Sequence, residues 1–381
     1  MAFWQRELLR DGVSMTFNQT YELDLPKSGL LGSLVLYIRS TENANALATL
    51  RKWRLIDYIS KIEIIGDGSE VIKSFDGLEA LAAAYHDDGV EPVSMWRTWS
   101  SVPHRQWIPI HFGRFLQDEL FGLDLSRFDQ VTLKITNDAT STQFTTDITI
   151  SVIAYWLRES AGAFAGYFRE EVWKSWAPVA AAVEYSDLPV ALPIRRILLE
   201  ARPGVDTADA KNNSSMHRLM NPIDFSFRTG QTRVFYGPLE VLGHLSTVEL
   251  RRPVETRGNI NHAQGYGFES GVGYAIQNMG AWATDADAIA TVLGNMRSDV
   301  QDSAQELGYV TANGNLAWSV RGHGYNHTVP LWIAQKPDLS DLIDPEAMKV
   351  VKLDITCQSG TTVSGTSRAA RNAIILNRLV R

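Results

Sequence analysis

The chain has 381 residues, of which 45% are hydrophobic and 21% charged, as in a folded protein with room for one large domain or two ordinary ones. Its formal net charge of −7 disfavours a nucleic-acid-binding role, because such proteins usually carry a basic face. Cys357 is the single cysteine, which excludes an intrachain disulfide and a cysteine-rich zinc site.

The first ten residues, MAFWQRELLR, predict a short amphipathic helix. Their charges are incompatible with the apolar centre of a signal peptide. The longest apolar stretches, at 29–38 and 148–157, fall short of the roughly 20 residues that cross a bilayer. We therefore expect a soluble protein that is made in the cytoplasm.

Short strands follow, together with two brief helical segments. KIEII, GDGS and EVIKS (61–74) predict a strand, a tight turn and a strand, with Gly66 and Gly68 supplying the positive φ of the hairpin. Residues 77–85 predict a short helix, and residues 112–125 predict a second short helix or a turn. VTLKIT, which starts at Val131, alternates apolar and polar residues as a half-buried strand does.

The chain then repeats this pattern. Leu25-Pro26 and the run GLLGSLVLYIR correspond, 163 residues later, to Leu188-Pro189 and LPIRRILLEAR. Further matches at this shift place Ile62, Ile64, Val71 and Ile72 on Phe225, Phe227, Val234 and Phe235. After a two-residue deletion, the helix starting at Leu78 falls on a segment starting at Leu239.

Later parts of the two repeats match at a longer shift. WIPIHF (107–112) corresponds to TVPLWI (328–333), and VTLKIT (131–136) corresponds to VKLDIT (351–356), 220 residues later. Each repeat ends on another apolar run. The second repeat therefore holds about 60 extra residues between Leu242 and Pro330.

The predicted fold class is all-β, because many short strands in about 150 residues indicate a sandwich or barrel. A parallel α/β sheet would need a helix after nearly every strand. The predicted domains are an N-terminal arm or short helix (1–14), a first barrel (15–160), a linker (161–183) and a second barrel (184–381) with an insertion at about 254–327. The aromatic residues of the linker indicate that it packs against the barrels, and the insertion contains a predicted helix at 285–307.

The order of strand, G-x-G hairpin, GLEAL helix, I-P-I strand and GLDLSRFDQVTLKIT resembles the double jelly-roll major capsid proteins of the tectivirus–adenovirus lineage. The resemblance implies two tandem eight-stranded jelly rolls with short helices, and a structural role without enzymatic activity, cofactor or metal. In that lineage three subunits form a trimer of pseudo-sixfold outline. Such trimers tile an icosahedral shell, often over an internal membrane.

The same resemblance implies a set of partners and a place in the virion capsid. The partners are the chain itself as a homotrimer, neighbouring trimers, penton and minor capsid proteins, and an internal lipid membrane. The N-terminal helix would then dock beneath the shell, against a neighbour or a lipid surface. The residues expected at this contact are Phe3, Trp4, Arg6, Leu8 and Arg10.

Nucleic acid is not an expected partner. Four arginines near the C-terminus could meet phosphate groups, although such spacing is more typical of a solvated strand face or of salt bridges. They are Arg368, Arg371, Arg378 and Arg381.

Two other functions remain open. A bicupin enzyme also has two barrels in tandem, but it binds metal through an H-x-H pair, which this sequence lacks. His323 and His327 lie in a Gly/Asn-rich segment and are interpreted as surface residues. A carbohydrate- or receptor-binding sandwich would use exposed aromatic rings, whereas Trp107, Trp156 and Trp173 fall in predicted strands or the linker, which favours core or interface packing.

Overall fold

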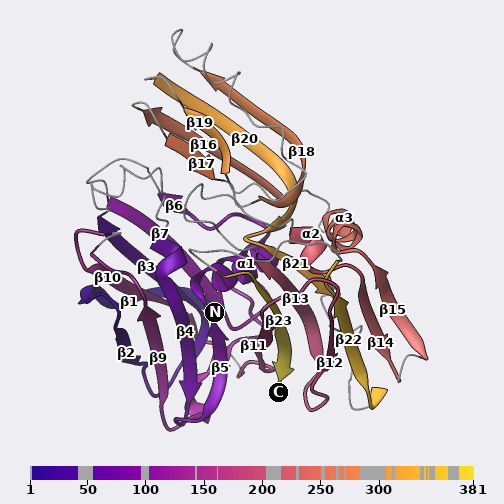
Figure 1. Cartoon of the computed structure of the whole chain (residues 1–381). Coiled ribbons are helices and arrows are strands. Elements are labelled where there is room, and N and C mark those ends of the chain that lie inside the picture. The colour runs from indigo at the N-terminus through magenta and orange to yellow at the C-terminus, as the bar shows by residue number, and fades with distance from the viewer. Residues whose placement is uncertain are drawn as a thin grey trace. The chain divides into compact units, whose positions relative to one another are not determined.

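The computed structural model divides into two compact units, Met1–Glu171 with Asn377–Arg381, and Val172–Leu376 (Figure 1). No helix in the part of the chain that is described is long and apolar enough to cross a membrane. The described residues are 2–41, 55–95, 103–141, 144–160, 162–202, 216–228, 231–249, 254–262, 266–269, 272–283, 306–310, 314–334, 339, 342, 348–358 and 369–381.

Two sheets build the first unit. One has the strand order β1-β10-β3-β7-β6, with β8 beside β3, and the other contains the order β11-β5-β4-β9-β2. The strands are β1 (Phe3–Met15), β2 (Thr20–Asp24), β3 (Leu30–Thr41), β4 (Ile59–Gly66), β5 (Glu70–Phe75), β6 (Ser94–Met95), β7 (Pro103–His111), β8 (Leu123–Asp124), β9 (Val131–Asn137), β10 (Ile148–Arg158) and β11 (Tyr167–Trp176). The helices are α1 (Gly77–Asp88) and the 3₁₀ turns η2 (Leu55–Tyr58) and η3 (Leu125–Arg127).

Helix α1 confirms the predicted helix and extends it by one turn. Asp76 accepts a hydrogen bond from the Glu79 backbone N–H, and the Glu79 carboxylate accepts one from the Asp76 N–H at 2.7 Å. This reciprocal capping satisfies two backbone donors that a helix N-terminus otherwise leaves without partners. Gly89 ends the helix in the left-handed conformation, which a glycine adopts without steric cost.

The predicted hairpin is confirmed as β4 and β5, but one of its glycines has a different role. Asp67 (φ 50°) and Gly68 (φ 72°) supply the positive φ of the turn, and Gly66 does not. A Cβ on Gly66 would lie 2.5 Å from the Phe128 ring, so this glycine makes room for an aromatic side chain.

The N-terminal segment is a strand, and the predicted helix is wrong. β1 pairs antiparallel with β10 from Phe3 opposite Arg158 to Met15 opposite Ile148. The physical reason is long-range: the hydrogen bonds and side-chain contacts offered by β10 outweigh a local pattern that also fits an amphipathic helix. The 112–125 segment is a loop followed by β8 and η3, in agreement with a turn rather than a helix.

The second unit contains a four-stranded sheet of order β12-β22-β14-β15 and a sheet containing the order β16-β20-β21-β13-β23, with β18 beside β20. A separate ribbon joins β17 and β19. The elements are β12 (Val183–Asp187), β13 (Ile194–Arg202), α2 (Met216–Leu219), β14 (Ile223–Phe227), β15 (Thr232–Gly237), α3 (Leu239–Glu249), β16 (Val254–His262), β17 (Tyr266–Glu269), β18 (Val272–Ala283), β19 (Glu306–Val310), β20 (Gly314–Tyr325), β21 (Thr328–Trp332), β22 (Val351–Thr356) and β23 (Arg371–Val380).

The extra residues of the second repeat lie between α3 and β21, as predicted, and include strands β16 to β20. Of the predicted helix at 285–307, residues 285–305 lie outside the described residues. Glu306 and Leu307 belong to strand β19, so the prediction is wrong for these two residues.

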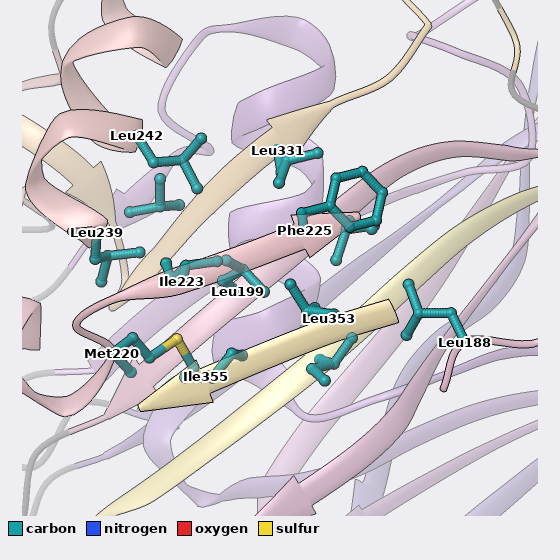
Figure 2. Close-up of a cluster of buried hydrophobic side chains, with 14 of the residues drawn as sticks. Leu188, Leu199, Met220, Ile223, Phe225, Leu239, Leu242, Leu331, Leu353 and Ile355 are labelled. Carbon is teal, nitrogen blue, oxygen red and sulfur yellow. The ribbon is translucent and has the colours of Figure 1, made fainter. Parts of the chain in front are cut away.

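The core of the second unit forms where the inward faces of its sheets meet helix α3 (Figure 2). Phe225 and Leu353 are fully inaccessible to solvent, and Leu239 and Leu242 from α3 pack into the same cluster. Ring packing continues along β14, where the centroids of Phe225 and Phe227 are 5.1 Å apart. The alternation of buried and half-buried residues in β22 confirms the predicted strand pattern.

The strand registers of the two units demonstrate the predicted repeat. In the first unit Thr20 lies opposite Thr136, and in the second Val183 lies opposite Thr356, which are the same positions at shifts of 163 and 220. Likewise Val35 lies opposite Pro109, and Leu198 opposite Pro330. Both prolines therefore occupy the same place in equivalent strand pairs.

One part of the predicted alignment is displaced by two residues. Ile62 pairs with Ile135, and the equivalent pair in the second unit is Ile223 with Ile355, so Ile62 corresponds to Ile223 and not to Phe225. The two-residue deletion therefore precedes β14. A slip of two residues preserves the alternation of a strand, which is why the pattern of apolar residues did not reveal it.

The segment predicted as a linker contains strand β11, and Tyr167 and Phe168 within it are fully buried. This confirms that the segment packs and is not a free tether. β11 neighbours β23, the last strand of the second repeat, as β1 neighbours β10, the last strand of the first. β11 is thus the second repeat's counterpart of β1.

Replacing Phe225 by alanine should lower the free energy of unfolding by about 3–5 kcal/mol, because it leaves a large cavity in a closed core. Chemical unfolding monitored by tryptophan fluorescence measures this loss. The control is Val248→Ala on α3, where a side chain 73% exposed should contribute less than about 0.5 kcal/mol. Equal effects of both substitutions would contradict the described core.

Candidate assembly surfaces

Strand β1 carries all five residues predicted for an assembly contact, and it is the outermost strand of its sheet. Phe3 is 48% and Leu8 53% exposed. Trp4 is half-buried, because its ring packs directly over Gly32 of β3, where a Cβ would lie 2.4 Å from the ring. Since side chains alternate along a strand, the five residues do not form the single helical face that was predicted.

The charged members of this group are also placed by the strand. The Arg6 guanidinium lies 5.6 Å from the centre of the Tyr155 ring on β10, directly across the strand pair. Arg10 donates to the Leu9 carbonyl at 2.8 Å and sits between two register shifts of β1. The exposed outer edge of β1 therefore combines apolar and cationic side chains.

Strand β15 is a second outermost strand, at the end of the four-stranded sheet. Its side chains Val234 and Tyr236 are 48% and 59% exposed. Arg233 forms a bidentate pair with Asp224 on β14, with distances of 2.7 and 3.0 Å, and lies over the Tyr236 ring. The pair holds the ring on the surface, so the edge presents an ordered apolar row.

The edge of strand β5 differs, because strand β11 covers it in parallel, with Glu170 opposite Lys73. The Lys73 ammonium lies 3.3 Å from the Glu170 carboxylate, and both side chains are at most 3% exposed. Tyr167 donates to Glu70 at 2.6 Å, and burial together with this acceptor raises the pKa of Tyr167. This contact is consequently polar, closed to solvent and specific in register.

The last strand of the chain, β23, adds a further ion pair to the first unit. Arg378 contacts Glu171, and burial lowers the pKa of Arg378 although Glu171 opposes that effect. Arg127 donates to the Arg381 carbonyl at 3.0 Å. In the second unit Arg371 lies 3.5 Å from Glu200. Salt bridges are therefore the structural setting of Arg371 and Arg378, while Arg368 lies outside the described residues.

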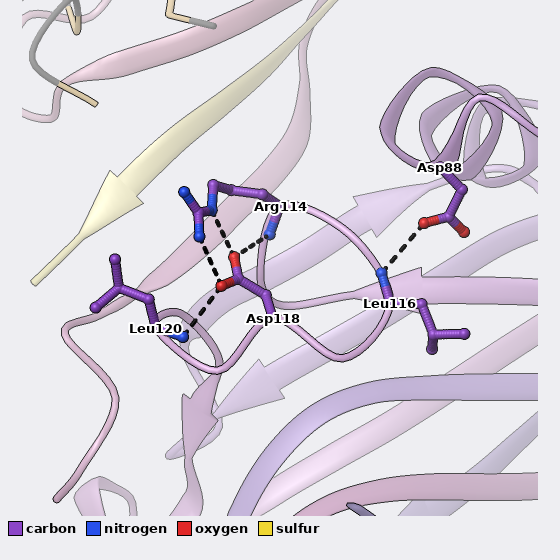
Figure 3. Close-up of polar contacts among 5 residues, drawn as sticks. All are labelled: Asp88, Arg114, Leu116, Asp118 and Leu120. Atoms are coloured by element: carbon purple, nitrogen blue, oxygen red, sulfur yellow. Dashed lines mark hydrogen bonds and ion pairs between the residues drawn. The ribbon is translucent and has the colours of Figure 1, made fainter. Parts of the chain in front are cut away.

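The loop between β7 and β8 is built around one carboxylate (Figure 3). Asp118, 2% exposed, accepts from the backbone N–H of Arg114 and from its guanidinium at 2.6 and 2.8 Å. It also accepts from the Leu120 N–H at 3.1 Å. Asp88, at the end of α1, accepts from the Leu116 N–H at 3.1 Å.

These bonds keep an apolar tip on the surface, with Phe115, Leu116 and Leu120 between 38% and 46% exposed. The sequence pattern suggested only a helix or a turn here, and the Arg114–Asp118 spacing of four residues was compatible with both. The signal that could have identified the loop is the pair of glycines, Gly113 and Gly122, that bracket it.

No protein-family model matches the chain, and no curated protein matches it. Solved structures do match. The major capsid protein of Sulfolobus turreted icosahedral virus aligns over 98% of this chain and 96% of its own, with a TM-score of 0.60 at 9% identity. The PBCV-1 virus capsid protein aligns over 100% and 94%, with a TM-score of 0.56 at 11% identity. The major capsid protein P2 of bacteriophage PM2 aligns over 100% and 98%, with a TM-score of 0.50 at 9% identity.

The chain has the double jelly-roll fold. The predicted fold class is thus confirmed. The three tryptophans that the sequence places in strands or in the linker differ in exposure. Trp156 is 1% exposed and Trp173 is 42% exposed. Trp107 is half-buried and stacks on Tyr37, with ring centres 4.5 Å apart.

His327 is 4% exposed, so its interpretation as a surface residue is wrong. It is the second residue of the two-residue turn between β20 and β21, with a positive φ of 64°. The side chain of His323 lies outside the described residues; its backbone belongs to β20, opposite Tyr274.

Two carboxylates of the first jelly roll, Asp118 and Asp88, have a lowered pKa. Burial alone would raise the pKa of Asp118, but the hydrogen bonds and charge of Arg114 outweigh burial and lower it. Burial likewise opposes ionisation of Asp88, and the hydrogen bond and charge of His111, 2.9 Å away, lower its pKa. A carboxyl whose folded pKa is lowered stabilises the fold above its unfolded pKa, and the contribution disappears as the pH falls through the folded pKa.

Asp118→Asn should therefore reduce the free energy of unfolding by about 1.5–3 kcal/mol at pH 7, through the loss of a charged acceptor for Arg114. The difference from wild type should stay constant down to about pH 5 and shrink below about pH 4, near the unfolded pKa of aspartate. Urea unfolding across this pH range measures it. The matched control is Glu119→Gln, an exposed neighbour in the same loop, which should change stability by less than about 0.5 kcal/mol at every pH.

Proposed function

We propose that the chain is a viral major capsid protein, a structural subunit without catalytic activity that assembles with itself into an icosahedral shell. The observation that carries the proposal is the alignment of nearly the whole chain with whole capsid proteins, at 94–98% coverage of those chains. A match of both jelly rolls in tandem is far more restrictive than a match to one, because single jelly rolls serve many functions.

The assembly unit in this proposal is a homotrimer. Two jelly rolls in each subunit give six in a trimer, and this supplies a pseudo-hexagonal tile that closes by ordinary cyclic symmetry. The repeated strand registers support the idea that the two jelly rolls are similar enough to occupy comparable positions in such a tile. Neighbouring trimers, penton and minor capsid proteins, and a lipid layer beneath the shell are the further partners that the proposal implies.

The bicupin alternative requires a set of metal ligands at the centre of a barrel. The sequence offers no H-x-H pair, and the inward face of the second jelly roll is filled by apolar side chains such as Phe225 and Leu353. The carbohydrate-binding alternative would rely on exposed tryptophans, of which Trp173 is an example.

The full-length protein, purified without denaturant, should sediment at three times the mass of the 42.4 kDa chain. Negative-stain microscopy should show particles of hexagonal outline, or shells. A monomer that binds a stoichiometric divalent metal would contradict the proposal and favour the bicupin, and a monomer that binds glycans would favour the carbohydrate-binding alternative.

A further inference from the structure

We propose that strand β1 of one subunit pairs in parallel with strand β15 of the next subunit, so that the β11–β5 contact made within one chain recurs between chains. The inference rests on the proposed function, because it specifies the surface through which subunits assemble. It follows from two equivalences between the repeats and from the strand edges that are left uncovered.

The first equivalence joins β1 and β11. Each is the strand that opens its repeat, precedes a short strand of identical register (β2 or β12), and lies beside the last strand of its repeat. The two strands can be aligned at a shift of 164, where Phe3-Trp4-Gln5-Arg6-Glu7 corresponds to Tyr167-Phe168-Arg169-Glu170-Glu171 with one identical residue. Both begin with two aromatic residues and end with glutamate.

The second equivalence joins β5 and β15. Ile64 lies opposite Lys73, and its counterpart Phe225 lies opposite Phe235, so Lys73 corresponds to Phe235 at a shift of 162. The register irregularity that follows these pairs, between Ile64 and Ile65, recurs between Phe225 and Ser226. An irregularity at the same place in both hairpins fixes the correspondence of the strands residue by residue.

The third observation concerns which edges are covered. β11 pairs with β5, whereas the equivalent edge strand β15 and the equivalent covering strand β1 each have a neighbour on one side only in the described chain. Unpaired strand edges bind other strands readily. Both edges also expose apolar side chains, Phe3 and Leu8 on β1, and Val234 and Tyr236 on β15.

The equivalences predict the register of the new contact. Within one chain Glu170 lies opposite Lys73, and the equivalent pair between subunits is Arg6 opposite Phe235. Glu171 lies opposite Ser74, and the equivalent pair is Glu7 opposite Tyr236. The buried ion pair is thus replaced by a cation beside aromatic rings, an arrangement that is favourable without a counter-ion. A neighbouring subunit, and not lipid, is therefore the partner that this part of β1 fits.

The contact is heterologous, because different strands of the two subunits meet. Repeating it produces a closed ring when the rotation between subunits completes a circle. In a ring of three subunits, β5–β11 contacts within each subunit would alternate with β15–β1 contacts between subunits.

Cysteine cross-linking tests the register directly. Glu7→Cys and Tyr236→Cys, combined in a Cys357→Ala background, should form disulfides between subunits when the assembled protein is oxidised. Products of two and three chains should appear on a non-reducing gel, about tenfold more abundant than with a control pair, because proximity raises the effective thiol concentration. The control pair is Glu7→Cys with Val248→Cys, whose second site is 73% exposed on α3.

Sedimentation of the uncross-linked wild type separates the possible failures. Trimers without the 7–236 link would overturn this inference and leave the proposed function intact. A wild-type protein that stays monomeric would overturn both. Equal linking of the control pair would show that the thiols react by collision, and would also overturn the inference.

A second pair of variants tests the contact without new disulfides. Val234→Glu combined with Tyr236→Glu places one carboxylate opposite Glu7 and a second two residues away on the same strand, and should raise the subunit concentration needed for half-assembly by about tenfold or more. Val248→Glu, at a side chain of α3 that is 73% exposed, should leave assembly unchanged. Identical thermal unfolding of the monomeric variants confirms that folding is intact, and unimpaired assembly of the double variant would contradict the proposal.

Discussion

A buried ion pair fixes the strand that opens the second repeat against the hairpin of the first. Lys73 and Glu170 lie 3.3 Å apart and are almost inaccessible to water. Removing two charges from water costs about as much free energy as their attraction returns, so the pair contributes little net stability. It contributes register instead, because a slip of β11 by one residue would turn the Glu170 side chain to the other face of the sheet, away from Lys73. The hydrogen bond from Tyr167 to Glu70 on the same edge reinforces this register.

The duplication could be recognised from the sequence because apolar alternation survives divergence. The strands that match best, such as VTLKIT and VKLDIT, bury every second side chain, and their pairing partners keep the same register. The same periodicity also concealed the two-residue displacement at β14, since both alignments place apolar residues inward. The counterpart of β1 was concealed for a different reason. β11 is matched to β1 by aromatic and charged residues and not by an apolar run, so the sequence pattern predicts a linker there.

The features that sequence alone did not reveal depend on partners far along the chain. MAFWQRELLR fits a helix locally, and only the pairing with β10, about 140 residues later, makes it a strand. The residues predicted for an assembly contact, Phe3, Trp4, Arg6, Leu8 and Arg10, therefore lie on a strand and not on one face of a helix. The loop around Asp118 was not foreseen as a surface, because its order comes from one buried carboxylate and from Asp88 at the end of a helix, neither of which has a periodic signature. Edge strand β15 was recognised as a strand, while its exposure depends on sheet order, which a local pattern does not contain.

The chemical difference between the two equivalent edges follows from how each contact forms. A contact within one chain has a high effective concentration, so it needs little net stability, and a buried ion pair that mainly specifies register is sufficient. A contact between subunits must also offset the loss of translational and rotational freedom, about 4–15 kcal/mol. Apolar surface supplies that free energy more effectively than a desolvated ion pair does. On this argument a duplicated subunit evolves a polar edge where the contact forms within one chain and an apolar edge at the contact that we propose between subunits. Lys73 on β5 and the exposed Val234 and Tyr236 on β15 fit this distribution.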